Sequence, residues 1–218
     1  MNEDRDDYEA LRTGFTAVVS HELRTPLARV MALLESRTEE PRAVLEQVKG
    51  EIEEMAALVD DVLFLAELES GRAVVALTPT LALPELQRLA SDYAERAERA
   101  DVRINVEGNP EAELPVRRRM LCVLVENLIE NALRYAGPGA TLRLSVEPGL
   151  LLAADDGPGV DDDDLPRIFE RFYRSDRARA SRGTGLGLAI VKNVVSAAGG
   201  TVEARRSPEG GLEIRCSF

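Results

Sequence analysis

The only histidine in this chain of 218 residues, His21, lies in the run VVSHELRTPLARV. Glu22 follows it directly and Pro26 comes five residues later. On a helix, at about 100° per residue, the His21 ring lies about 200° from its apolar neighbours two positions away, so it points to solvent or to a partner. Pro26 has no backbone N–H, so the carbonyl of Glu22 loses its helical partner and the helix can bend there. A reactive side chain beside a flexible point suits the approach of something large. A solvated histidine without a role is the alternative.

Thr25 lies one turn after His21 and shares its face of the helix. The run therefore reads HExxT, and it lacks the second histidine that a zinc-dependent metalloprotease needs at this spacing. The motif does not predict a zinc site.

A second polar group lies in ENLIENALRY (Glu126 to Tyr135). Asn127, Asn131 and Arg134 fall within about 40° of one another on a helix face. Two amide oxygens and a guanidinium are typical of a site for hydrated magnesium and its phosphates, since Mg2+ prefers oxygen ligands. Taken alone, the same pattern also fits an ordinary exposed helix face.

Two glycine clusters follow in the sequence. In DDGPGV, Gly157 and Gly159 allow the backbone to approach a flat ligand, and Asp155 can accept a hydrogen bond from an exocyclic amine such as that of adenine. In GTGLGLAIV, beginning at Gly183, the backbone amides and a helix N-terminus suit phosphate oxygens. This second run is not a Walker loop, because no Gly-Lys-Ser/Thr follows.

The segment FERFYRSDRARASRG (Phe169 to Gly183) separates the two glycine clusters, and it is aromatic first and then rich in arginine. Such a segment can act as a lid whose arginines, Arg174 foremost, reach terminal phosphates. Each cluster is ambiguous alone, whereas their order and spacing together are specific.

The first third of the chain must place His21. Its apolar residues recur every three or four positions from about Leu11 to Leu68, which predicts two long helices joined by a turn within Glu35 to Arg42. Since such a hairpin cannot cover both apolar stripes, we expect dimerisation into a four-helix bundle. The stripes are Phe15, Val19, Leu23, Leu27, Val30 and Leu34, and then Val44, Val48, Ile52, Met55, Val59, Val62 and Ala66.

After Glu69 the pattern changes. We expect a short strand at Val74 to Thr78, a helix opened by Pro84, and half-exposed strands in VRINVEG and TLRLSVEP. LLLAADDG reads as a buried strand, and SPEGGLEIRCSF as a hairpin turn with a last strand. The acidic run Asp161–Asp164 is expected to cap a following helix. The second part is thus an α+β domain with helices covering one face of a mixed sheet.

Composition limits the classes of function. A formal charge of −12 argues against general nucleic-acid binding, which needs a basic surface. Cys122 and Cys216 are expected to be buried, reduced thiols, because a zinc site or a disulfide framework needs more cysteines at closer spacing. No apolar run reaches the roughly 20 residues of a membrane span, and no signal peptide is visible. We therefore expect a soluble, cytoplasmic chain that can be a fragment of a longer protein.

In their order, these motifs resemble the catalytic core of the two-component sensor histidine kinases. SHELRTPL resembles the H box, ENLIENALRY the N box, DDGPGV the first glycine box, IFERFYR the F box and GTGLGLAIV the second glycine box. The resemblance covers nearly all of the chain, from about Phe15 to its end. Since most members of the family carry sensor and membrane segments, we favour an excised cytoplasmic core of a membrane-anchored sensor. It implies a homodimeric phosphotransfer hairpin followed by an α/β sandwich, the Bergerat-type ATP-binding domain. The expected division is residues 1–70, a linker at 71–82, and residues 83–218.

The resemblance also implies roles. His21 takes the γ-phosphoryl group of ATP and passes it to an aspartate on the receiver domain of a response regulator. Glu22 is the candidate base for that transfer, and Thr25 helps to orient the water that dephosphorylates the regulator. Arg174 offsets charge on the transferring phosphoryl group. The nucleotide-binding positions are Asn131 and Asn127 for magnesium, Arg134 for the phosphates, Tyr135 and Asp155 for adenine, and Gly157, Gly159, Gly183, Thr184, Gly185, Leu186 and Gly187 around the pocket and lid.

Two alternatives belong to other classes. ATP hydrolases and serine kinases of the same ATP-binding fold place a glutamate four residues before the magnesium asparagine, where this chain has Asn127. A catalytically silent dimeric scaffold would lack a catalytic residue, and none is missing from the boxes. Departures from the family pattern are mild: Asp156 stands where asparagine is common, Arg134 where lysine is common, and the lid is short.

Overall fold

The structure is a computed structural model that describes residues 3–35, 40–69, 78–175 and 183–218. It divides into two compact units, Met1–Leu63 and Phe64–Phe218. The strand expected at Val74–Thr78, except for its last residue, and most of the turn before Pro41 lie outside the described residues. Within the described ranges, no helix combines the length and the apolar character that crossing a membrane requires.

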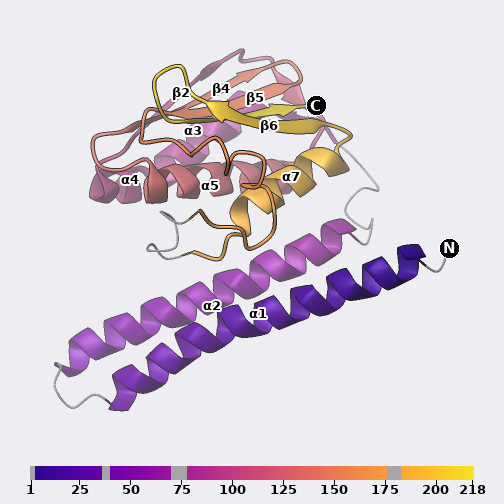
Figure 1. The fold of residues 1–218 in the computed structure, drawn as a ribbon. Helices are drawn as coiled ribbons and strands as arrows, with labels where there is room; N and C mark the ends of the chain where they lie inside the picture. Colours follow the sequence, from indigo (N-terminus) through magenta and orange to yellow (C-terminus); the bar gives the residue numbers. More distant parts are fainter. Residues whose placement is uncertain (1–2, 36–39, 70–77, 176–182) are drawn as a thin grey trace. The chain divides into compact units, whose positions relative to one another are not determined.

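Two long helices, α1 (Glu3–Glu35) and α2 (Pro41–Glu69), run antiparallel (Figure 1). They make up the first unit, except that the end of α2 from Phe64 on is grouped with the second unit. The predicted hairpin is therefore confirmed. Helix α1 continues through Pro26, so the proline removes one backbone hydrogen bond without ending the helix.

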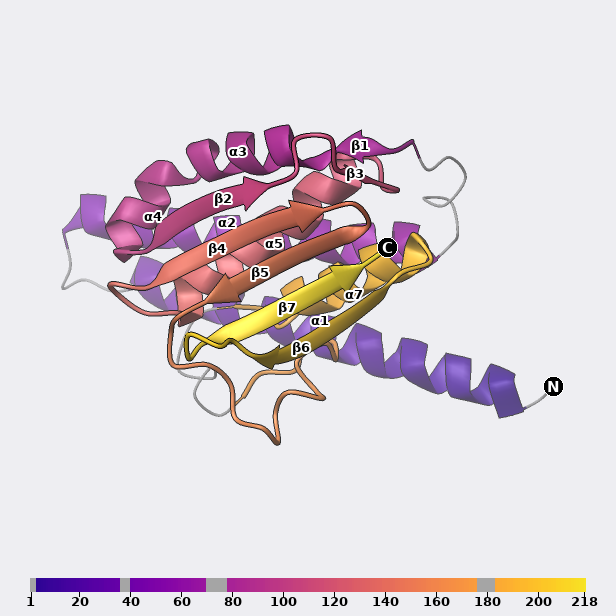
Figure 2. The same ribbon diagram turned by 90° about the horizontal axis from the view of Figure 1, so that it is seen from above.

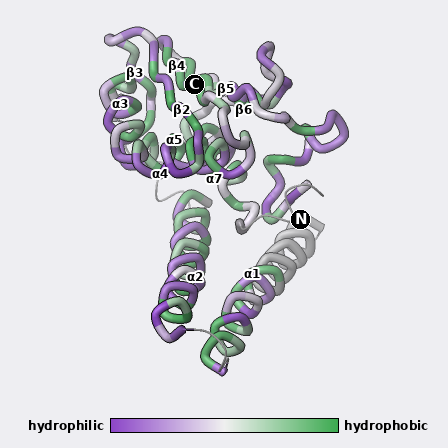
Figure 3. Tube along the Cα trace, turned by 90° about the vertical axis from the view of Figure 1, so that its left-hand side faces the viewer, coloured by the Kyte–Doolittle hydropathy of each residue, from purple (hydrophilic) through white to green (hydrophobic). Residues whose placement is uncertain are grey.

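Apolar side chains of the hairpin fall into two groups, and apolar residues recur along both helices (Figure 3). Val30 and Leu58 are buried, whereas a second set is exposed in the single chain. That set comprises Val18, Leu27, Met31 and Leu34 on α1 and Leu63, Leu45, Ile52 and Val59 on α2. The last three recur every seven residues, the spacing of a helix seam that meets a partner helix.

The second unit contains a five-stranded sheet in the order β2 (Arg103–Gly108), β4 (Thr141–Glu147), β5 (Leu150–Asp155), β7 (Leu212–Ser217), β6 (Thr201–Arg206). Strands β2 and β4 are parallel and the remaining pairs are antiparallel. The sheet is mixed, as predicted from the sequence.

The helices α3 (Ala82–Asp92), α4 (Ala94–Ala100), α5 (Arg118–Tyr135) and α7 (Gly187–Ala197) cover one face of this sheet (Figure 2). A two-stranded ribbon, β1 (Thr80–Leu81) with β3 (Glu113–Leu114), lies beside them. Helix α5 buries one apolar stripe, Leu121, Leu124, Val125, Leu128 and Ile129. Because that stripe faces the core, the polar stripe of the N box is left for the opposite side.

The helix expected after Asp161–Asp164 does not form, and that prediction is wrong. Residues 161–172 make successive turns in which the carbonyl of Asp161 accepts hydrogen bonds from the N–H groups of both Asp164 and Leu165. The N–H groups of Asp164, Arg167 and Glu170 bond to carbonyls three residues earlier, so separate turns form in place of a continuous ladder of α-helical bonds.

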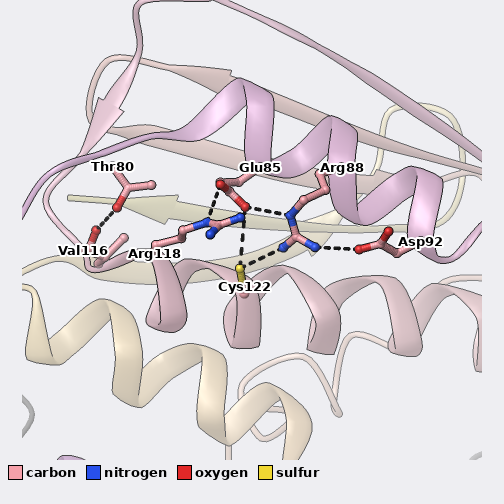
Figure 4. A network of polar contacts seen from close by, with 7 residues as sticks. All are labelled: Thr80, Glu85, Arg88, Asp92, Val116, Arg118 and Cys122. Atoms are coloured by element: carbon pink, nitrogen blue, oxygen red, sulfur yellow. Dashed lines mark hydrogen bonds and ion pairs between the residues drawn. The ribbon is translucent and has the colours of Figure 1, made fainter.

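A polar network joins α3 to α5 (Figure 4). Glu85 accepts hydrogen bonds from Arg118 at 2.5 Å and from Arg88 at 3.0 Å, and Arg88 also donates to Asp92 at 2.6 Å. The Sγ atom of Cys122 lies 3.2 Å from Arg88. Burial raises the pKa of this thiol, so it stays protonated at neutral pH. The network fixes the start of the helix that carries the N box.

Both cysteines are free thiols, as expected. Cys216 is fully buried on β7, and burial raises its pKa to about 12. Cys122 is half-exposed rather than buried, because its neighbours are the polar side chains between α3 and α5 and not the apolar core.

Candidate functional site

His21 lies on α1 with 73% of its side chain exposed. Its flanking apolar residues Val19 and Leu23 are half-buried, so the ring points away from their side of the helix, as predicted. The Oε1 atom of Glu22 lies 3.4 Å from the Nδ1 atom of the ring. Thr25 donates to the His21 carbonyl at 3.3 Å, which places its side chain on the histidine's face. The imidazole is thus accessible and has one nitrogen beside a carboxylate.

The predicted N-box residues lie on the last turns of α5. Asn127 donates its amide N–H to the carbonyl of Val123 at 2.8 Å. Its Oδ1 atom faces α7, where a Cβ added to Gly187 would lie only 2.7 Å away. Asn131 is half-buried, and its amide makes no hydrogen bond within the described part of the chain. Asn127 and Asn131, which helical spacing places on one stripe, therefore differ in their hydrogen bonding.

The second glycine box contacts both the N box and the F box. A Cβ added to Gly183 would lie 2.2 Å from Nη1 of Arg134 and 3.5 Å from the hydroxyl of Tyr135. Gly185 has φ +72°, and a Cβ there would lie 2.8 Å from the backbone carbon of Phe172. Only glycine fits this position, because both its backbone conformation and its contacts exclude a side chain. The candidate Gly183 is thereby brought to the candidates Arg134 and Tyr135, which lie far from it in sequence, and Gly185 is placed against Phe172 of the F box.

Thr184 and Leu186, the other two candidates in the second glycine box, shape the backbone just before α7 (Gly187–Ala197). Thr184 accepts a hydrogen bond from the backbone N–H of Leu186 at 3.3 Å, just before α7 begins. The Leu186 side chain is fully buried, so this residue can meet a ligand only through its backbone. The remaining free N–H groups at the start of α7 provide donors for an anion.

Asp155 ends strand β5 and is 8% exposed. Its Oδ1 accepts hydrogen bonds from the N–H groups of Gly157 at 2.9 Å and Leu212 at 3.3 Å. Burial raises the pKa of Asp155, and the two backbone hydrogen bonds oppose that rise. Both bonds go to Oδ1. Within the described part of the chain, Oδ2 is therefore left as an acceptor for a ligand amine.

The first glycine box packs closely against two segments. A Cβ on Gly157 would lie 2.5 Å from the carbonyl oxygen of Ala136, just beyond α5. Gly159 has φ +70° and faces the backbone of Gly210 and Gly211. A Cβ on Gly211 would in turn lie 2.0 Å from Oδ1 of Asp155. The glycine pair before β7, which the sequence presented only as a hairpin turn, thus forms part of the Asp155 site.

Asp156, the departure from the family pattern, has a structural partner. Its Oδ1 accepts a hydrogen bond from the backbone N–H of Thr141 at 2.6 Å, where β4 begins. An asparagine oxygen could accept the same bond, which explains why either residue suits the position.

Arg174 is half-buried and follows the turns of residues 161–172. Its Nε atom is shielded from solvent. Part of the proposed lid, residues 176–182, lies outside the described residues, so the expectation of a short lid rests on the sequence alone.

Among the residues that the structure describes, no three His, Cys, Asp or Glu side chains gather to hold a metal by themselves. A magnesium ion at this site would instead use amide oxygens together with the phosphates of a nucleotide, in line with its preference for oxygen ligands. The polar face of α5 fits that requirement, with Asn131 the better placed of the two asparagines because its amide is not engaged by its own helix.

Comparison with known proteins agrees with both units. Residues 11–71 match the family model of the His Kinase A (phospho-acceptor) domain. Residues 116–218 match the histidine kinase-, DNA gyrase B-, and HSP90-like ATPase family.

Curated proteins similar to this chain are named as histidine kinases or sensor proteins. The chain is 35% identical over 216 residues to the signal transduction histidine-protein kinase BaeS of Escherichia coli, an alignment that covers 94% of this chain and 46% of BaeS. It is 34% identical to the phosphate regulon sensor protein PhoR of Pseudomonas aeruginosa, covering 96% of this chain and 50% of PhoR. The chain thus spans about half the length of these relatives.

Solved structures give the same result. The histidine kinase AdeS of Acinetobacter baumannii has a TM-score of 0.70 and 25% identity, and the match covers 90% of this chain and 97% of that one. Full-length ShkA, in complex with AMPPNP, has a TM-score of 0.63 and 32% identity over 91% of this chain and 44% of ShkA. The chain belongs to the two-component sensor histidine kinases, of which it carries the catalytic core: a phosphoacceptor hairpin and an ATP-binding domain.

Proposed function

We propose that this core phosphorylates itself on His21 from ATP and passes the phosphoryl group to an aspartate of a response regulator receiver domain. The observation that carries this proposal is the exposed His21 imidazole with the Glu22 carboxylate 3.4 Å from its Nδ1. A histidine of this kind occurs in the same chain as an ATP-binding domain. The ATPase and scaffold alternatives are not favoured, because a matched phosphoacceptor domain precedes that domain.

In the proposed transfer, Nε2 of His21 attacks the γ-phosphorus of ATP. A nitrogen–phosphorus bond forms while the bond from the γ-phosphorus to its bridging oxygen breaks, which releases ADP. The proton on Nδ1 moves toward Glu22, whose carboxylate also holds the ring in the tautomer with Nε2 free. The distance of 3.4 Å is long for a hydrogen bond, and such contacts often tighten only when substrate is bound.

The second unit would hold the nucleotide. The free oxygen of Asp155 suits the adenine amine, and Tyr135 would lie at the adenine edge. Arg134 and the amides that begin α7 suit phosphate oxygens. The complex of ShkA with AMPPNP supports nucleotide binding by a similar chain.

Magnesium, held by Asn131 and by the amide oxygen of Asn127, would supply positive charge beside the phosphates. Arg174 would add a guanidinium on the side of the transferring group. In phosphoryl transfer, positioning and charge neutralisation supply most of the rate enhancement.

We further propose that the hairpin forms a homodimer through its exposed apolar set. Large apolar side chains at three- to seven-residue spacing on both helices are costly to leave in water, and a second hairpin would cover them in a four-helix bundle. Thr25, on the His21 face, would then serve the dephosphorylation of a docked regulator. A core that uses ATP and a receiver domain would act in the cytoplasm, and any membrane anchor would belong to segments beyond this chain. The boundaries at residues 70 and 83 remain a proposal.

Autophosphorylation tests the proposal directly. Wild-type chain, His21→Gln and the control Glu53→Gln, which changes an exposed residue of α2, are incubated with Mg2+ and γ-labelled ATP. We expect label that is acid-labile and base-stable in the wild type and the control, and no label in His21→Gln. Wild-type chain that binds ATP but takes no label would contradict the kinase proposal.

A further inference from the structure

The segment of residues 161–175, here called the turn segment, connects the first glycine box to the second. Its turns are held by short-range backbone bonds, such as Arg167 N–H to the carbonyl of Asp164 at 2.9 Å and Glu170 N–H to that of Arg167 at 2.8 Å. Bonds of this range shape each turn but do not fix how the two ends of the segment lie relative to each other.

One side chain supplies that long-range restraint. The hydroxyl of Tyr173 donates to the Oδ1 atom of Asp164, nine residues earlier. The Arg167 guanidinium stacks on the Tyr173 ring, 4.2 Å from its centroid, and is itself paired with Glu170 at 3.4 Å. The bond to Asp164 also raises the pKa of Tyr173, so the hydroxyl keeps the proton that it donates. Tyr173 thus closes the segment on itself.

The residue before Tyr173 is anchored to the second glycine box. The N–H of Phe172 donates to the carbonyl of Gly185 at 3.0 Å. Phe172 has φ +61°, a left-handed conformation that few non-glycine residues adopt, so surrounding contacts must hold it. The carbonyl of Tyr173 lies on the same glycine, 2.9 Å from where a Cβ would be.

We infer that Tyr173 is a positioning residue for phosphoryl transfer, acting through its bond to Asp164 to set the backbone from which Arg174 extends. This inference rests on the proposed function of His21 and Arg174. Tyr173 itself need not touch the nucleotide. Loss of its hydroxyl would leave the pocket for ATP intact while the neighbouring arginine is misplaced.

The test compares Tyr173→Phe, Asp164→Ala and Asp164→Asn in the whole chain. We measure the single-turnover rate of His21 labelling at saturating ATP and, separately, the dissociation constant of an ATP analogue. Tyr173→Phe and Asp164→Ala should slow labelling by about 10- to 100-fold, the range expected for a small misplacement of a catalytic group. Nucleotide affinity should change by less than about threefold.

Two further comparisons separate positioning from general stability. Asp164→Asn should restore most of the rate, because its amide oxygen still accepts the bond. The double variant Tyr173→Phe/Asp164→Ala should be no slower than either single variant, since both remove one interaction. The control Tyr93→Phe removes a tyrosine hydroxyl that bonds to Glu130 elsewhere in the same unit, and it should leave the rate unchanged.

The inference would be overturned if Tyr173→Phe labels as fast as the wild type, if nucleotide affinity falls as much as the rate, or if Tyr93→Phe is equally slow. These outcomes differ from failure of the proposed function, in which the wild-type chain itself takes no label on His21.

Discussion

Truncating Ile52 should weaken the proposed homodimer without unfolding the hairpin. The Ile52 side chain is 52% exposed in the single chain and lies between Leu45 and Val59 at seven-residue steps. Fully burying an isoleucine contributes about 1.5–3 kcal/mol, so covering its exposed half contributes about 1 kcal/mol per protomer. A twofold dimer contains the residue twice. Ile52→Ala should therefore cost about 2 kcal/mol, which raises the dimer dissociation constant about 30-fold.

Sedimentation equilibrium over a range of protein concentrations measures this constant. Alanine favours helix at least as well as isoleucine, so circular dichroism should show no loss of helix. Leu81→Ala is the matched control, because Leu81 is 48% exposed but lies on β1 in the second unit. An Ile52→Ala constant within about twofold of the wild-type value, or an equal effect of Leu81→Ala, would refute the assignment of this face to the dimer.

Three further predictions concern the ATP-binding domain. Burial raises the pKa of Asp155, so its ionised form opposes folding, and the wild-type protein loses stability as pH rises through the folded pKa. The free energy of unfolding of Asp155→Asn should therefore rise relative to that of wild type as pH increases from about 4 to 8, as measured by urea titration. The nucleotide affinity of this variant should fall. If Asp155→Asn instead loses stability relative to wild type over this pH range, the inferred direction of the Asp155 pKa shift is wrong. In the same assay, Asp156→Ala should lower the free energy of unfolding by about 1 kcal/mol. Asp156→Asn should lower it by less than half as much, because its side-chain oxygen still accepts the bond from the Thr141 N–H at the start of β4. Equal losses would show that the charge of Asp156, and not this hydrogen bond, matters. Gly185→Ala should lower the free energy of unfolding by about 1–3 kcal/mol more than the control Gly199→Ala. Both glycines have positive φ, but only a Cβ at residue 185 would clash with the backbone of Phe172. Equal losses would assign the whole effect to backbone conformation.

The hairpin and the mixed sheet could be predicted because their signals are local. Apolar residues every three or four positions define α1 and α2, and alternation defines β2 and β4. The failure at Asp161–Asp164 is also local in origin. Acidic residues before Leu165 resemble a helix N-cap, but most N–H groups that follow bond to carbonyls three residues back, which gives turns and not an α-helix.

What the sequence could not supply is which residues meet across the chain. Nothing in the run EGGLE indicates that Gly211 lies against Asp155, or that Leu212 donates to it, because these contacts depend on β5 and β7 being neighbours. Burial of Glu51 is equally invisible, since helical periodicity assigns it to a polar position. In the structure it is 2% exposed, with Nη1 of Arg29 at 3.5 Å from its carboxylate.

The clearest gain from the structure concerns the two asparagines of α5. Helical spacing places Asn127 and Asn131 on one stripe and so gives them the same expected role. Asn127 uses its N–H group on its own helix, and its Oδ1 fills the space left by the missing side chain of Gly187. The bond to Val123 uses only the N–H group of Asn127, so its Oδ1 keeps both lone pairs but is packed against Gly187. Asn131 keeps its whole amide within the described part of the chain. The same contact joins the N box to the start of α7, so a change at Asn127 or Gly187 should alter both the proposed metal ligands and the backbone amides proposed to bind the phosphates.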